Sequence, residues 1–339
     1  MRALVCAIGL LLPWQHAAPS ARVAVRIDAA EAEAVLRIAD RQASGAEVPA
    51  RDWDALFATD GYRRLREREQ SMGRPLDEGA FRQFVLSARV TSRAALLRAT
   101  LETWTRADLS GAAARALAYL PSQAAIRATV YLVIKPAPNS FVFDTTKDPA
   151  IFLYLDPART RAQIENTVSH ELHHIGASSL DADYQKAIAG LAPPARLAAT
   201  WMGAFAEGLA MLAAAGGPDV HPHVVSPPED RARWDRDVAN FDRDLAGLDR
   251  FFQDVVHERI AGEDAVQKAA MAFFGVQGPW YTVGWKMAVI VERAFGRTAV
   301  VNAVGDPRRL LVDYNRAVRA GHLALPRWSD DLLAAVEAR

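Results

Sequence analysis

The chain has 339 residues, 51% of them hydrophobic and 24% charged, and its 40 basic side chains balance its 40 acidic ones. This length and composition are typical of a globular protein with one large core or two smaller ones. Because the formal net charge is zero and no block of Lys and Arg stands out, we expect neither a nucleic acid nor an anionic membrane surface as a partner.

The first twenty residues differ in character from the rest of the chain. Arg2 precedes an apolar run over residues 3–14, and small residues follow at 17–21. This pattern is typical of a cleaved export signal, and the run is too short to span the ~30 Å hydrocarbon layer of a membrane. We therefore expect residues 1–20 to be a signal peptide, and the protein to be exported, periplasmic or secreted, with no membrane attachment after cleavage.

The only cysteine, Cys6, lies inside this predicted signal. The mature chain would then contain no thiol, which excludes disulfides, cysteine-ligated zinc and cysteine nucleophiles. Histidines and carboxylates must carry any metal chemistry.

The region from residue 21 to residue 120 is predicted to be mostly helical. Residues 23–27 alternate like a short strand, and Asp28 can cap a helix that runs to about residue 43. Further helices are expected at about 50–72, 76–88, 92–106 and 110–119.

The pattern then changes to short β-branched and aromatic runs at 128–134, 140–143 and 151–155, which predict a small sheet. Asp156 and Pro157 next supply an N-cap and a first-turn proline for a helix that Gly176 would end. A strand thus leads directly into this helix.

A second long apolar helix is expected at 195–215, and the loop 218–228 that follows is the best candidate for a hinge between two lobes. The later helices are expected at about 229–260, 263–274, 281–295, 306–319 and 329–337. We predict an α+β, predominantly α-helical fold: a small β-sheet packed on the helix after Asp156, with a catalytic core over 121–217 and a mostly helical C-terminal lobe over 218–339.

The helix expected after Asp156 contains the pattern H-E-x-x-H, with His170, Glu171 and His174 at the fixed positions. The two histidines lie one turn and ~40° apart on a helix, so both can reach a single metal ion. Glu171 lies next to them and can take a proton from an attacking water and return it to a leaving amine. His173 points ~100° away from His174 and is not expected to be a ligand. Chance alone would produce this pattern in roughly one chain in a hundred.

A catalytic zinc usually has three protein ligands and one open position. Ala177 and Leu180 stand where a metzincin has its glycine and its third histidine, so the third ligand must come from elsewhere. Glu207 is the only carboxylate of the helix at 195–215 and has no Lys or Arg three or four residues away, so a zinc ion would compensate its burial. The alternative is that Glu207 reaches solvent or an arginine of another element. Weaker ligand candidates are Asp181, Asp183, His221 and His223.

H-E-x-x-H on one helix and Glu207 in an E-G-x-A context on a later helix resemble the gluzincins, the thermolysin-like zinc metallopeptidases. The intervening residues 175–206 are more numerous than in thermolysin-like enzymes, so the chain looks more like poorly characterised bacterial families of zinc-dependent peptidases with a longer insert. The resemblance covers about residues 150–212. It implies one Zn²⁺ per chain and a peptide or protein substrate.

The resemblance also carries two finer expectations. The strand at 151–155 stands where gluzincins have a sheet edge along which extended substrate lies, and Tyr281, after a Gly-Pro turn, stands where a distal-lobe residue stabilises the oxyanion. For Tyr281 the alternative is an aromatic ring packed beneath a helix start. Two alternatives to a peptidase remain: an exported non-enzymatic protein with a structural zinc site, and a zinc hydrolase of a non-peptide amide. Glu171 favours an enzyme, because a structural site needs the histidines but not that carboxylate.

Overall fold

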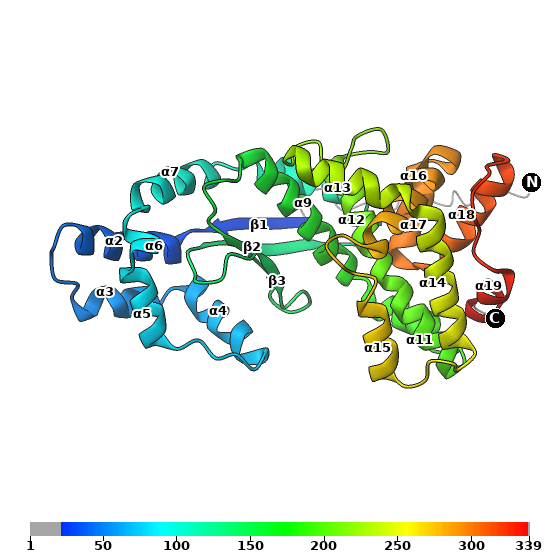
Figure 1. The fold of residues 1–339 in the computed structure, drawn as a ribbon, viewed down its shortest axis with the longest axis horizontal. Helices are drawn as coiled ribbons and strands as arrows, with labels where there is room; N and C mark the ends of the chain where they lie inside the picture. The colour runs from blue at the N-terminus through cyan, green and yellow to red at the C-terminus, as the bar shows by residue number, and fades with distance from the viewer. Residues whose placement is uncertain (1–21, 338–339) are drawn as a thin grey trace, which may run out of the picture.

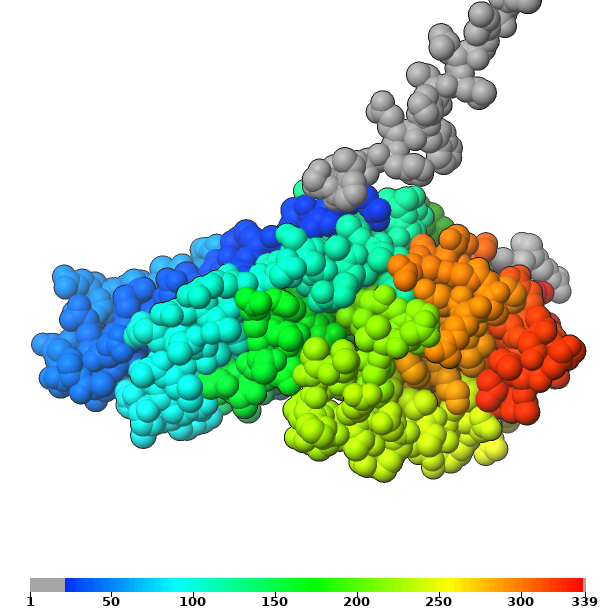
Figure 2. Space-filling view, turned by 90° about the horizontal axis from the view of Figure 1, so that it is seen from above, coloured from blue at the N-terminus to red at the C-terminus, as the bar shows by residue number. Residues whose placement is uncertain are grey.

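The computed structural model describes residues 22–337, so the predicted export signal and Cys6 lie outside the described residues. The molecule is elongated, with the first helices at one end, the sheet near the middle and the C-terminal helices at the other end (Figure 1). From above, the segment around residues 160–220 lies between the two ends (Figure 2). The fold is α+β and predominantly helical, as predicted.

Four strands form one mixed sheet in the order β1-β2-β4-β3, where β1, β2 and β4 run parallel and β3 runs antiparallel to β4. The strands are β1 (Val23–Asp28), β2 (Ile126–Val133), β3 (Phe141–Phe143) and β4 (Ala150–Tyr154). Because β2 and β4 are central and almost wholly buried, both are mostly apolar along their length. The expectation that residues 151–155 form a sheet edge is wrong, since β3 pairs with the other side of β4.

Helices from the N-terminal region pack with the sheet into a first hydrophobic core. These helices are α2 (Ala30–Ala43), α3 (Ala50–Phe57), α4 (Asp60–Ser71), α5 (Glu78–Leu86), α6 (Ala88–Thr91), α7 (Ala94–Trp104) and α8 (Leu109–Leu117). The single helix expected at 50–72 is divided into α3 and α4, because the Thr59 hydroxyl accepts from the backbone N–H of Tyr62 and starts a new helix.

The helix that carries H-E-x-x-H is α9 (Arg161–Ser178), which begins later than expected. Thr160 caps it in a capping box with Gln163, while Asp156 accepts from the N–H of Ala158 in the preceding turn. Gly176 does not end α9 but lies inside it. A Cβ there would lie 2.3 Å from Leu120 Cδ1, so this glycine permits close packing rather than a helix stop.

The later helices form a second hydrophobic core, rich in aromatic rings such as Phe205, Phe252, Trp280 and Trp328. They are α10 (Asp181–Ile188), α11 (Pro193–Met202), the 3₁₀ turn η1 (Gly203–Phe205), α12 (Ala206–Ala215), α13 (Pro228–Ala239), α14 (Phe241–Val256), α15 (Glu263–Met271), α16 (Pro279–Phe295), α17 (Arg297–Gly305), α18 (Arg308–Ala320) and α19 (Asp330–Val336). The helix expected at 195–215 is therefore interrupted by η1, which ends two residues before Glu207.

The domain boundaries at residues 120 and 217 stay a prediction.

Among the described residues, the stretch Pro193–Ala215 is long and apolar enough to cross a membrane by length and composition alone. Within the protein, 61% of its most apolar window is buried, and α12 packs against both α9 and α16. The apolar character of this stretch is thus accounted for by its place in the core.

Candidate metal centre

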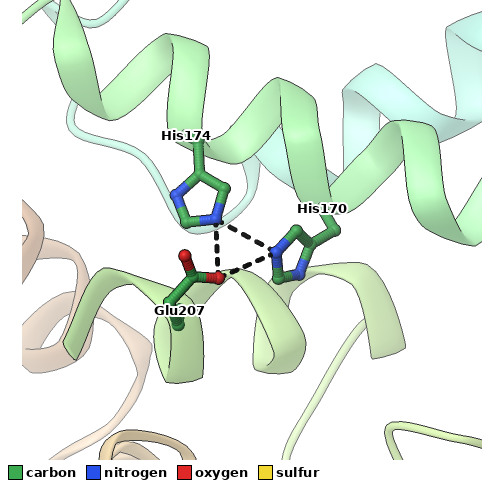
Figure 3. A group of neighbouring side chains, drawn as sticks. All are labelled: His170, His174 and Glu207. Atoms are coloured by element: carbon green, nitrogen blue, oxygen red, sulfur yellow. Dashed lines mark hydrogen bonds and ion pairs between the residues drawn. The ribbon is translucent and has the colours of Figure 1, made fainter. Parts of the chain in front are cut away.

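His170 and His174 of α9 face Glu207 of α12, and the three side chains converge on one point (Figure 3). The Nε2 atoms of the two histidines are 3.0 Å apart, and Glu207 Oε2 lies 3.2 Å from that of His170 and 3.1 Å from that of His174. The structure thus brings together the three residues that the sequence singled out as metal ligands.

The triangle of ligand atoms has the dimensions of a tetrahedral zinc site. Zn–N and Zn–O bonds of about 2.0–2.2 Å at tetrahedral angles place neighbouring ligand atoms roughly 3.3–3.5 Å apart, close to the observed separations. The three side chains are 14%, 21% and 21% exposed, so the triangle is sheltered but still reaches solvent. Two imidazoles and a carboxylate are also ligand types that zinc accepts, and the residues present fit this metal.

The charges in the triangle favour a cation at its centre. Burial alone would raise the pKa of Glu207, but the charges and hydrogen bonds of His174 and His170 bring it well below its usual range. Burial alone would lower the pKa of His174, but the Glu207 carboxylate raises it above the ordinary value of 6.5. A positive charge between these groups, from a proton or a metal ion, is therefore stabilised.

The glycine next to Glu207 fixes the position of α12 against α16. A Cβ on Gly208 would lie 2.1 Å from the backbone nitrogen of Trp285, so the two helices touch backbone to backbone. Gly208 thus serves the contact between α12 and α16, while Gly203 has no neighbouring atom within 4 Å of an added Cβ.

Glu171 and Tyr281 lie beside the triangle. Both line a cleft of about 360 Å³ together with His170. The Tyr281 ring, in the first turn of α16, is nearly parallel to the His170 ring, with an interplanar angle of 11° and centroids 6.4 Å apart. Burial, followed by the charge of Glu207, raises the pKa of Tyr281 above its ordinary value, so this hydroxyl keeps its proton.

His173 is fully buried on the other side of α9, with Nε2 3.4 Å from the carbonyl oxygen of Tyr119. Burial and then the neighbouring His174 and His170 lower the pKa of His173 to about 3, so it is neutral. It is not part of the group of ligand atoms, in agreement with the helical geometry.

The weaker ligand candidates do not join the triangle among the described residues. Asp181 and Asp183 open α10, and Asp183 pairs with Lys186. His221 pairs with Asp235, and the Nδ1 of His223 lies 3.0 Å from the Ser226 hydroxyl.

Apart from His223, which was a weaker ligand candidate, the other lining residues of the cleft were not selected from the sequence. Arg159 and His223 line it, as do Asp230 and Arg233 of α13 and Gln277 of the turn before α16. Gln277 has a left-handed backbone, with φ of 66°. This conformation could not be predicted from the sequence, because residues other than glycine usually avoid positive φ. The neighbouring Gly275 and Gly278 were the only local signal of an unusual turn.

The comparisons with known proteins identify one family. Residues 53–321, more than three quarters of the chain, match the family described as "Putative zinc dependent peptidase (DUF5700)". No curated protein and no solved structure matches the chain. The matched range contains the whole triangle, Glu171 and Tyr281, and the chain therefore belongs to this family.

Proposed function

We propose that the protein is a zinc metallopeptidase that holds one Zn²⁺ on His170, His174 and Glu207 and hydrolyses peptide bonds in the adjacent cleft. The observation that carries the proposal is the triangle of three ligand atoms 3.0–3.2 Å apart, one of whose members, His170, also lines the cleft. The ligand set, two histidines of one helix and a glutamate of a later one, favours a gluzincin type of site.

Zinc in such a site supplies a Lewis acid and lowers the pKa of water to about 7. Glu171, one residue after the first histidine, is placed to take a proton from the attacking water and to pass it to the leaving amine. Tyr281 is placed to donate its hydroxyl proton in a hydrogen bond to the carbonyl oxygen as that oxygen becomes an anion. The two residues approach the cleft from different helices, α9 and α16.

Two alternatives make different predictions. A structural zinc site in a non-enzymatic protein normally has four protein ligands and is closed to solvent, whereas three candidate ligands and an adjoining cleft are seen here. A zinc hydrolase of a non-peptide amide would use the same groups on another substrate, and only substrate trials separate it from a peptidase. The pattern of residues 1–20 supports the further proposal that the protein is exported.

The proposal is tested by incubating the zinc-loaded protein with a mixed quenched-fluorescent peptide library and comparing it with Glu171→Gln. This change keeps the shape of the side chain but removes the base, so we expect cleavage to fall by at least about a hundredfold with zinc content unchanged. Glu165→Gln is a matched control on the same helix, because Glu165 faces the backbone N–H of Asp108 and not the cleft. Equal cleavage by wild type and Glu171→Gln, or cleavage by neither, would contradict the proposal.

A further inference from the structure

An arginine of the cleft wall, Arg159, has no ion-pair partner among residues 22–337. Arg159 belongs to the turn between β4 and α9, and it lines the same cleft as His170 and Glu171. Its Nη2 donates to the Thr167 hydroxyl at 2.7 Å, and its carbonyl oxygen accepts from Trp104 Nε1 at 3.4 Å. Both ends of this residue are thus held, and the guanidinium is fixed against α9.

The attachment to α9 sets the distance from Arg159 to the catalytic carboxylate. Thr167 and Glu171 are four residues apart, so they lie on the same face of α9, roughly 6 Å apart along its axis. An extended peptide advances about 3.3 Å per residue. A guanidinium in this position therefore reaches a substrate group one or two residues from the bond next to Glu171.

The two arginines that line this cleft differ in their pairing. Arg233 on α13 donates to Asp230 at 2.6 Å, which neutralises that pair. Arg159 is half-buried, and burial lowers the pKa of its guanidinium. The negative charges of Asp156 and Asp230 raise this pKa, but by less. Over residues 22–337, no carboxylate forms an ion pair with Arg159 within 4.0 Å, whereas Arg161 and Arg233 each form one.

A guanidinium that pairs with no carboxylate of the described chain can pair with a carboxylate of a bound ligand. Its remaining N–H donors form a planar fork that matches a carboxylate in two parallel hydrogen bonds. Thr167 occupies only one Nη of this fork. The cleft thus presents a fixed, unsatisfied cation at a short distance from the reaction centre.

We propose that Arg159 binds a carboxylate group of the substrate within two residues of the cleaved bond, so that the protein selects acidic peptides. This inference rests on the proposed peptidase function. The carboxylate has two chemical sources, the side chain of Asp or Glu and the free C-terminus of a short peptide. An Asp or Glu side chain would make the protein an endopeptidase with acidic specificity, and a free C-terminus would direct it to chain ends.

The test uses peptides of one length that carry Glu or Gln at each of the two positions on either side of the cleaved bond, each with a free or an amidated C-terminus. We expect wild type to cleave the carboxylate-bearing peptides with kcat/KM about tenfold higher than their neutral counterparts. Arg159→Gln should bring this ratio close to one while cleavage of the neutral peptides is retained. Arg159→Lys keeps the charge but loses the fork and should give an intermediate ratio.

Two further variants separate recognition from folding. Thr167→Val removes the hydroxyl that holds the guanidinium and should lower the ratio without removing the charge. Arg161→Gln, two residues from Arg159, is the matched control, because Arg161 is exposed, pairs with Glu165 and does not line the cleft. Its ratio should equal that of wild type. A ratio near one in wild type, or a ratio that survives in Arg159→Gln, overturns the proposal.

Binding keeps this test distinct from the proposed function. The same peptides are titrated onto zinc-loaded Glu171→Gln, which does not turn over, and the dissociation constants are measured by calorimetry. We expect Glu171→Gln to bind the acidic peptides more tightly than the neutral ones, and the double variant with Arg159→Gln to lose this difference. That result supports the carboxylate site even if no peptide is cleaved. If wild type cleaves neutral and acidic peptides at equal rates, the proposed peptidase function is supported and the proposed carboxylate site at Arg159 is contradicted.

Discussion

Gly208 of α12 and Gly284 of α16 are in direct backbone contact: a Cβ on Gly208 would lie 2.6 Å from the Cα of Gly284. This contact joins the helix that bears Glu207 to the helix that bears Tyr281, three residues before Gly284. The distance between a metal ligand and the proposed oxyanion donor is therefore set by two glycines.

Gly208→Ala tests this relationship. The added methyl group would overlap the backbone of Gly284 and Trp285, and a backbone cannot move aside as a side chain can, so α12 and α16 must separate. We expect a loss of about 1–3 kcal/mol in the free energy of unfolding, together with weaker zinc binding, because Glu207 moves with α12. The measurements are denaturant unfolding and a zinc titration.

Gly203→Ala is the matched control on the same stretch, since an added Cβ there meets no atom within 4 Å. It should leave zinc binding unchanged and keep or slightly raise stability, because alanine restricts the unfolded chain more than glycine. Equal effects of the two substitutions would contradict the account of this contact.

Tyr281→Phe removes the hydroxyl but keeps the ring that lies parallel to His170. We expect kcat to fall by about 10²–10³-fold, as for other donors to an oxyanion, with KM and zinc content nearly unchanged. Steady-state kinetics on one cleaved peptide provide the measurement. A wild-type kcat in this variant would contradict the oxyanion role and would indicate that Tyr281 only packs beneath the start of its helix.

Glu31 makes the stability of the protein depend on pH, and this effect does not involve the metal site. Its buried carboxyl accepts from the N–H of Ile134, and burial raises its pKa from 4.5 to about 8. Below pH 4.5 the group is protonated in both the folded and unfolded states. As the pH rises from 4.5 to 8 the unfolded state ionises first, so wild type loses a few kcal/mol of stability over this window.

Glu31→Gln should remove this contribution, so the free energy of unfolding of the variant falls less between pH 5 and pH 8 than that of wild type. Glu33→Gln is the control, because Glu33 is exposed on the same helix and should leave the pH profile unchanged. Parallel profiles for wild type and Glu31→Gln would contradict the assignment of the shift to Glu31.

Much of the candidate site could be predicted from local patterns. His170, Glu171 and His174 follow from a motif whose spacing matches one helical turn. Glu207 could be selected because it is a single carboxylate in an apolar helix. In each case the signal lies within one element, and the structure brings His170, His174 and Glu207 together.

Features that depend on contacts between distant segments were not predictable in the same way. The start of α9 is different, because the capping box of Thr160 with Gln163 is a local pattern that the sequence already contains. Gly176 was expected to end the helix. The structure explains this glycine by its close contact with Leu120, which leaves no room for a Cβ. The pairing of β3 with β4, and the approach of Arg159 to Thr167, likewise exist only in the folded chain.

The central claim is that His170, His174 and Glu207 hold the metal. The most direct measurement is the zinc content of the purified protein after dialysis, compared among wild type, His170→Ala, His174→Ala and Glu207→Ala, with His257→Ala as a control outside the site. We predict one zinc per chain in wild type and His257→Ala, and strongly reduced zinc in each of the three ligand variants. Stoichiometric zinc in Glu207→Ala, with the protein still folded, would contradict the account.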